Sequence, residues 1–129
     1  MFTLSNFLFV GIGAALGAWL RWILTYFFST LDPSLPHGTL AVNLIGGLLI
    51  GLSFAAMQSS AIEVSEEVRL FLNVGFLGAL TTFSTYSLEI LHLFLRGEVI
   101  MGVIFALLNV LGALLFCFLG WSLFNLFFK

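Results

Sequence analysis

Four long apolar stretches, separated by short polar breaks, constrain this 129-residue chain more than any other feature of its sequence. Each reaches the ~20 residues that an α-helix needs to cross the hydrocarbon core of a bilayer. In order, they cover Asn6–Phe28, Gly38–Gln58, Val68–Leu95 and Glu98–Phe128. We therefore predict an all-α membrane protein, with residues 1–129 forming one domain of four transmembrane helices and both termini on the same side.

The charge content argues against an ordinary soluble domain. Charged residues make up 8% of the chain and hydrophobic residues 61%, whereas soluble domains carry about 25% charged residues. Four basic and six acidic side chains cannot cover the surface of a soluble core. A net charge of −2, with no run of like charges, also argues against a nucleic-acid partner. We expect membrane lipid to surround most of the chain.

The basic residues do not select one orientation in the membrane. Arg69 and Lys129 fall on the side of the termini, whereas Arg21 and Arg96 fall toward the other side. Because basic residues normally mark cytoplasmic loops, two against two gives no decision. Either this small protein escapes a statistical rule, or its copies insert in both orientations and pair antiparallel. Charge counting leaves both interpretations open.

Polar residues within the second stretch are expected to face protein or water, because lipid makes unpaired polar groups costly. Thr39 and Asn43 are four residues apart and therefore share one face of a helix. Glycines that follow them allow close helix packing, at positions 46, 47 and 51. Asn43 is then either an interhelical hydrogen-bonding residue or part of a polar path through the membrane.

The third stretch has an unusually polar centre. Five serine or threonine residues and a tyrosine follow two glycines and occupy positions 81 to 87. These residue types lower helical propensity and offer partners for freed backbone groups. Broken helices at membrane depth occur only where protein or a water-filled cavity surrounds them. We therefore predict a non-helical break near Gly78–Thr82, buried at an interface, whose carbonyls are free to bind a cation.

Aromatic residues follow this break. Phe83 and Tyr86 are three residues apart and can share a helical face. Ring edges carry positive partial charge, so edges turned toward a cavity can favour an anion without binding it as tightly as a lysine would. Ordinary core packing is the alternative, because the chain contains 16 phenylalanines.

In the fourth stretch, Asn109 lies within a stripe of small residues at helical spacing, formed by Gly102, Ala106, Ala113 and Gly120.

Two charged residues have open roles. Arg21 is the basic residue that lies well inside a span, where it serves either an anion-attracting vestibule or a structural ion pair. Glu89 follows the polar segment of the third stretch, either as its partner or as a solvated helix end.

The chain resembles the Fluc-type (CrcB) fluoride channels over essentially its whole length, most specifically in the segments Gly17–Trp22, Gly38–Asn43 and Gly75–Glu89. This resemblance implies an antiparallel, dual-topology homodimer with two pores in the bacterial cytoplasmic membrane. It implies passive export of fluoride to reduce its toxicity, a channel function rather than an enzymatic one. It also implies a structural sodium ion at the dimer interface, held by backbone carbonyls of Gly78 and Thr81.

The same resemblance assigns pore residues. It implies that Thr39 and Asn43 line the pore, together with Asn109 in the fourth helix. It implies paired aromatic edges, the first from Phe83 and the second from Tyr86. The chain departs from the commonest family pattern at three positions. Tyr86 stands where relatives have phenylalanine, Phe105 where they have tyrosine, and Ala113 where they have serine.

A proton-coupled exporter of the small multidrug-resistance type is the main alternative function, because it is also a short four-helix antiparallel dimer. Such exporters carry a titratable acid in the first helix, whereas here no acidic residue precedes Asp32 in the first loop. A structural subunit without transport would explain the glycines and the hydrophobicity. It would not explain the polar break or the face shared by Thr39 and Asn43. The sequence therefore favours the channel.

Overall fold

The computed structural model describes residues 2–59 and 63–128. Within these residues, four helical spans are long and apolar enough to cross a membrane, and the third is a composite of several helices. The prediction of an all-α chain with four such spans is therefore confirmed. The elements are α1 (Leu4–Ser29), α2 (His37–Gln58), α3 (Glu66–Arg69), η1 (Leu70–Leu77), α4 (Gly78–Leu80), α5 (Ser84–Leu95) and α6 (Val99–Phe128).

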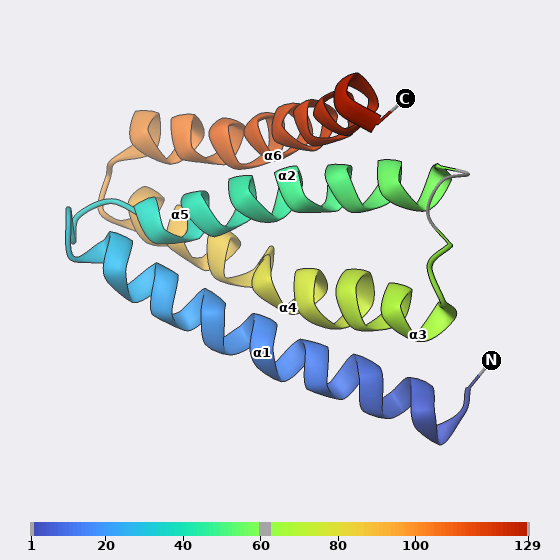
Figure 1. Ribbon diagram of the computed structural model, residues 1–129. Helices are drawn as coiled ribbons and strands as arrows, with labels where there is room; N and C mark the ends of the chain where they lie inside the picture. Colours follow the sequence, from blue (N-terminus) through green and yellow to red (C-terminus); the bar gives the residue numbers. More distant parts are fainter. Residues whose placement is uncertain (1, 60–62, 129) are drawn as a thin grey trace.

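The four spans lie side by side, with α2 next to α6 and the third span next to α1 (Figure 1). Both ends of the chain lie at the same end of the bundle, as the four spans predict. We call this the terminal end. The opposite loop end holds the α1–α2 and α5–α6 connections, residues 30–36 and 96–98. Lys129, which the charge count used, lies outside the described residues.

Small residues allow the helices to approach closely. On α2, a Cβ atom at Gly47 would lie 2.6 Å from the carbonyl oxygen of Ala113 on α6. Between α1 and the third span, a Cβ atom at Gly75 would lie 2.6 Å from the carbonyl oxygen of Val10. The predicted small-residue stripe of α6 therefore packs against a neighbouring helix, as the spacing of these residues indicated.

Large apolar side chains remain exposed on the outside of the bundle. Trp22 on α1 and Leu126 on α6 are 74% and 76% exposed. Such a surface is unfavourable in water over a large area but matches the hydrocarbon core of a bilayer. The exposed faces therefore fit the membrane environment that the composition predicts.

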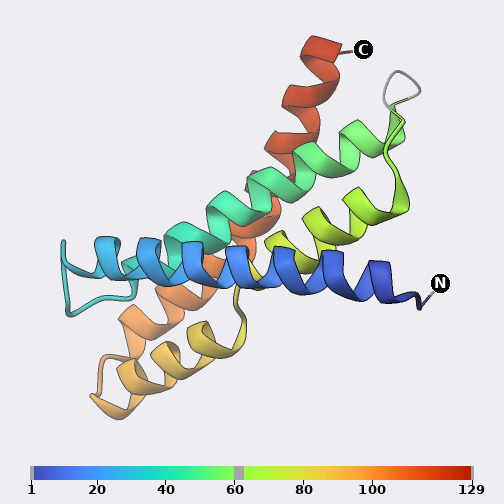
Figure 2. The same ribbon diagram turned by 60° about the horizontal axis from the view of Figure 1, so that its bottom comes forward.

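The third span combines a π-helix with a break. Its first part runs from α3 through the π-helical element η1 into α4, and its last part is α5. Residues 81–83 between them are not helical, and Thr81 has extended backbone angles (φ −84°, ψ 159°). Figure 2 shows α5 displaced from the line of α4. The predicted break is confirmed, but it begins at Thr81 rather than Gly78, which keeps helical angles (φ −62°, ψ −33°).

Candidate functional site

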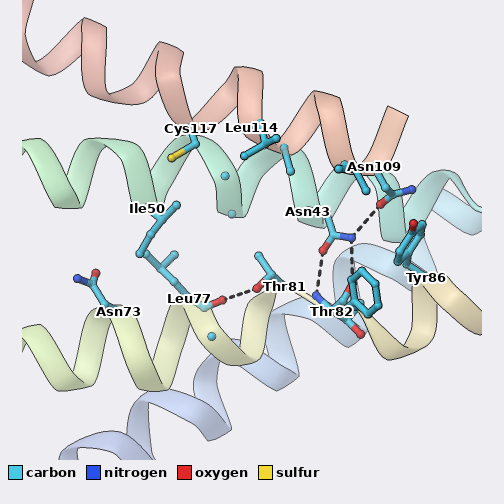
Figure 3. A pocket seen from close by; sticks show the side chains of 16 residues that line it. Asn43, Ile50, Asn73, Leu77, Thr81, Thr82, Tyr86, Asn109, Leu114 and Cys117 are labelled. Atoms are coloured by element: carbon cyan, nitrogen blue, oxygen red, sulfur yellow. Dashed lines mark hydrogen bonds between the residues drawn. The ribbon is translucent and has the colours of Figure 1, made fainter. Parts of the chain in front are cut away.

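A cavity of about 600 Å³ lies beside the break, between α2, α6 and the third span (Figure 3). It is partly open on the face of the bundle and its walls are mostly apolar. The structure brings six of the predicted site residues to its lining: Asn43, Gly78, Thr81, Phe83, Tyr86 and Asn109. The predicted residues Thr39 and Arg21 lie outside this lining: Thr39 contacts Glu89 on α5, and Arg21 contacts the backbone of Thr81.

Asn43 is the centre of a buried network of amides. Its Nδ2 donates to the carbonyl oxygen of Thr82 at 3.0 Å and to Oδ1 of Asn109 at 2.8 Å. Its Oδ1 accepts the backbone N–H of Thr82 at 2.9 Å. Asn109 in turn donates from Nδ2 to the carbonyl oxygen of Phe105 at 3.0 Å. The side chain of Asn43 therefore joins α2 both to α6 and to the break.

These contacts explain how the break is tolerated inside a membrane. In a continuous helix the N–H of Thr82 would donate to the carbonyl of Gly78, but here it donates to Asn43. The Thr82 hydroxyl accepts the N–H of Thr85 at 3.2 Å, as a capping residue does at a helix start. The Thr81 hydroxyl adds a hydrogen bond of 3.0 Å to the carbonyl of Leu77, which also accepts the Thr81 N–H at 3.1 Å. Side chains thus take over hydrogen bonds that the interrupted helix gives up.

Phe83 and Tyr86 form an aromatic pair at the cavity. Their ring centroids are 5.1 Å apart with an interplanar angle of 68°, so the edge of one ring meets the face of the other. Phe83 is 74% exposed in the single chain. Tyr86 is partly buried and packs against a small apolar cluster of Ile90, Leu93 and Phe105. The two rings therefore meet, although Phe83 precedes the first residue of α5 and does not lie on a helical face.

Thr39 and Glu89 form a second polar pair, between α2 and α5. The Thr39 hydroxyl donates to Oε1 of Glu89 at 2.6 Å, and Thr39 is 1% exposed. Oε2 of Glu89 is buried and has no hydrogen-bond partner among the residues that the structure describes. Glu89 was expected to pair with the polar segment of the third stretch or to be a solvated helix end, whereas the structure pairs it with Thr39 on α2.

Arg21 reaches the break from α1. Its Nη1 donates to the carbonyl oxygen of Thr81 at 3.4 Å. This places a positive charge at the carbonyl end of α4, where a helix carries partial negative charge. The sequence offered a vestibule or an ion pair for Arg21, but did not predict this contact with the backbone of the break.

Three further polar or sulfur-containing residues meet near the terminal end of the cavity, and sequence reasoning missed them. The Ser53 hydroxyl donates to Oδ1 of Asn73 at 2.7 Å. Nδ2 of Asn73 contacts the sulfur of Met57 at 3.2 Å. Asn73 also lines the cavity. The one signal in the sequence was an amide in an apolar run, because unpaired amides in lipid are costly.

Comparison with known proteins identifies the family of the chain. A family model described as CrcB-like protein, Camphor Resistance (CrcB), matches residues 8–121. A fluoride-specific ion channel FluC of Aromatoleum aromaticum is 48% identical over 95% of this chain and 92% of its own length. Proteins of the same name from Ralstonia pickettii and Acinetobacter baumannii are 46% and 41% identical, covering 89% and 86% of this chain and 90% and 86% of their own lengths. The chain therefore belongs to the CrcB-like family of multi-pass membrane proteins.

Proposed function

We propose that this chain forms a passive, fluoride-selective channel in the cytoplasmic membrane, which exports fluoride and thereby reduces its toxicity. The observation that carries the proposal is the network of Asn43, Thr82 and Asn109 beside the edge-to-face pair of Phe83 and Tyr86, at the cavity between α2, α6 and the third span. Relatives named fluoride-specific ion channels, 41–48% identical over most of the chain, support the same function. The exporter alternative requires an acidic residue in the first helix, and no acidic residue precedes Asp32.

The groups that line the cavity can bind a small anion weakly enough to release it again. None of the described residues that line it has a charged side chain. Amide donors and the positive edges of aromatic rings attract an anion more weakly than an ammonium group does. Conduction requires binding that is favourable enough for entry and weak enough for release. Asn109, Phe83 and Tyr86 supply these weak attractions, while Asn43 holds Asn109 and the break in place. The Thr39–Glu89 pair extends the polar path toward the loop end.

The functional unit in this proposal is an antiparallel, dual-topology homodimer. Two observations support a second copy on the open side of the cavity: the cavity is incomplete in one chain, and Phe83 beside it is 74% exposed. The even distribution of basic residues between the two sides supports insertion in both orientations. A second copy would cover the break, as broken helices in membranes require.

A sodium ion at the break is the second part of the proposal. Gly78 and Thr81, with the same residues of a second copy, would hold it through backbone carbonyls, the ligands that unwound helices offer to sodium. The donor set fits: the N–H of Thr82 donates to Asn43 rather than to Gly78, and the N–H of Thr85 donates to the Thr82 hydroxyl rather than to Thr81. The carbonyls of Gly78 and Thr81 therefore lack the donors that a continuous helix would give them. When bound, the ion would supply a fixed positive charge among these carbonyls.

Reconstitution into liposomes tests the channel. We expect liposomes loaded with fluoride to release it down its gradient, measured with a fluoride electrode, and to retain chloride under the same conditions. A proton gradient should leave the rate unchanged, because a passive channel, unlike a proton-coupled exporter, uses no proton. Equal release of both anions, or fluoride release no faster than from protein-free liposomes, would contradict the proposal. For the sodium site, replacing Na⁺ by a large organic cation should lower the thermal stability of the solubilised protein.

A further inference from the structure

The cavity has polar side chains at its two ends, separated along the direction of the helices (Figure 3). Asn43 and Asn109 lie at one end, next to the break. Asn73 lies at the opposite end, nearer the terminal end of the bundle, and its side chain extends from η1 toward α2. Apolar residues line the cavity between these groups, among them Ile50, Leu77 and Leu114. A second polar group at this end therefore needs its own explanation.

The amide donors of the cavity differ in what they already bind. A carboxamide nitrogen carries two hydrogens, and Asn43 gives both to oxygen acceptors, the Thr82 carbonyl and Asn109. Asn109 donates to the carbonyl of Phe105. Nδ2 of Asn73 contacts the thioether sulfur of Met57, which is a weak acceptor. Among the cavity amides, Asn73 thus has the donor group with the weakest partner.

Ser53 determines which way the Asn73 amide faces. Its hydroxyl, buried in α2, donates to Oδ1 of Asn73 at 2.7 Å. The sulfur of Met57 has no hydrogen to donate, so the nitrogen rather than the oxygen belongs beside it. The amide oxygen is therefore directed to Ser53, and the two N–H hydrogens remain for Met57 and for the cavity that Asn73 lines.

The backbone around Asn73 is also unusual. Asn73 is in the π-helical element η1, Leu70–Leu77. π-helical turns are rare and are frequent at functional sites. The next residue, Val74, is 57% exposed on the outside of the bundle, while Asn73 is partly buried at the cavity. The local backbone therefore presents the amide to the cavity and an apolar residue to the surroundings.

We propose that Asn73 is a second anion-binding residue of the pore, which donates a hydrogen bond to a small, partly hydrated anion such as fluoride at the terminal end of the cavity. Ser53 is its positioning residue. The inference rests on the proposed channel function and adds to it a contact separate from the Asn43 network. An anion that enters a mostly apolar cavity loses water, and the Asn73 amide replaces one of the lost hydrogen bonds.

The test compares Asn73→Asp and Asn73→Leu with the wild-type protein in liposomes, by fluoride efflux at a series of fluoride concentrations. Asn73→Asp keeps the shape and the acceptor for Ser53 but replaces the donor by a negative group. Asn73→Leu removes the donor at similar volume. We expect the fluoride concentration for half-maximal flux to rise about tenfold in both, as loss of one charge-assisted hydrogen bond predicts. Val74→Leu, on the same element but outside the cavity, should match the wild type.

Ser53 has its own readout. Ser53→Ala should raise the half-maximal fluoride concentration by a smaller factor than the Asn73 variants do. Ser53→Thr keeps the hydroxyl and should retain the wild-type value. In the Asn73→Leu background, Ser53→Ala should have no further effect, because the residue it positions is gone. Equal, additive effects in both backgrounds would overturn the positioning role.

The outcomes separate this inference from the channel itself. If the wild type conducts fluoride and both Asn73 variants have an unchanged concentration dependence, the Asn73 contact is wrong and the channel stands. If the wild type conducts no fluoride, both the channel function and the Asn73 contact are wrong. If Asn73→Asp elutes as a monomer where the wild type elutes as a dimer, Asn73 belongs to the subunit contact and the inference is overturned. Should Asn73→Leu fail to fold, the isosteric Asn73→Asp decides.

Discussion

Asn43 and Thr82 are joined by a reciprocal pair of hydrogen bonds, in which the side-chain amide of one pairs with both backbone groups of the other. Nδ2 donates to the Thr82 carbonyl at 3.0 Å, and Oδ1 accepts the Thr82 N–H at 2.9 Å. A residue 39 positions earlier in the chain thus supplies hydrogen bonds that the broken helix gives up. Asn43 is therefore both a candidate pore residue and a structural support of the break.

The first prediction follows from this pair. Asn43→Leu should lower the free energy of unfolding by about 1–3 kcal/mol for each Thr82 backbone group it leaves unpaired. Asn43→Asp keeps the acceptor for the Thr82 N–H but sets a carboxylate oxygen against the Thr82 carbonyl, so it should be destabilised as well. Thermal unfolding in detergent, followed by tryptophan fluorescence, measures both. Fluoride flux should be lost in Asn43→Leu, and a variant with wild-type stability and flux would remove Asn43 from both roles.

Much of this arrangement was predictable from the sequence. The lengths of the apolar stretches predicted the four spans, because a helix that crosses a bilayer needs about 20 apolar residues. The concentration of hydroxyl residues at positions 81–87 gave the break, and the spacing of Thr39 and Asn43 gave their common face. These are local properties of composition and periodicity. The polar groups that the structure buries are largely the ones that lipid would penalise.

The remainder depends on contacts between distant segments. The carbonyl of Thr81 meets Arg21 from α1, and Asn73 meets Ser53 from α2. No spacing rule links positions 60 or 20 residues apart. The π-helical geometry of η1 also has no local signature in the apolar run Leu70–Leu77. The exact start of the break was missed because Gly78, although a weak helix former, remains helical.

A second prediction concerns the Thr39–Glu89 hydrogen bond of 2.6 Å. Thr39→Val keeps the volume but removes the donor, so the buried Glu89 carboxyl loses its partner. The free energy of unfolding should fall by about 1–3 kcal/mol. Glu89→Gln keeps an oxygen acceptor for Thr39 and should retain more stability than Thr39→Val. Equal stability of Thr39→Val and the wild type, measured by thermal unfolding, would show that this bond contributes little.

A third prediction concerns Asp32 in the first loop. The Ser34 hydroxyl, 2.6 Å away, lowers the pKa of the Asp32 carboxyl below its ordinary 3.8, with smaller help from the Ser34 N–H and from His37. A lowered pKa stabilises the folded state above pH 3.8, and this contribution is lost as pH falls through the lowered value. Ser34→Ala should raise the Asp32 pKa toward 3.8, as followed by NMR titration of its carboxyl carbon. His37→Gln should raise it less, and the reverse order would contradict this assignment.

A fourth prediction concerns orientation. If the balanced basic residues reflect dual topology, a tag at one terminus should be detected on both sides of the membrane in intact cells. Adding lysines at the terminal end, through Ser5→Lys and Glu63→Lys, should bias insertion so that the termini face the cytoplasm. Detection of the unmodified chain in a single orientation would end the dual-topology proposal, and with it the antiparallel dimer.

The final prediction separates the electrostatics of the aromatic pair from its shape. Phe83 and Tyr86 meet edge to face, with centroids 5.1 Å apart, at the cavity that Asn43 and Asn109 also line. Phe83→Ile retains much of the volume but removes the positive ring edge, so fluoride flux should fall sharply while the dimer still forms. Tyr86→Phe keeps the ring and loses only the hydroxyl. Because the ring edge is the element proposed to attract the anion, Tyr86→Phe should remain active.

The liposome efflux assay distinguishes these two variants under identical conditions. Loss of flux in Tyr86→Phe alone would mean that the phenol hydroxyl is a required hydrogen-bond donor. A fully active Phe83→Ile protein with unchanged discrimination against chloride would disprove the aromatic-edge mechanism. In that case the amides would carry anion recognition alone, and the exposed Phe83 ring would be a packing surface for the second copy.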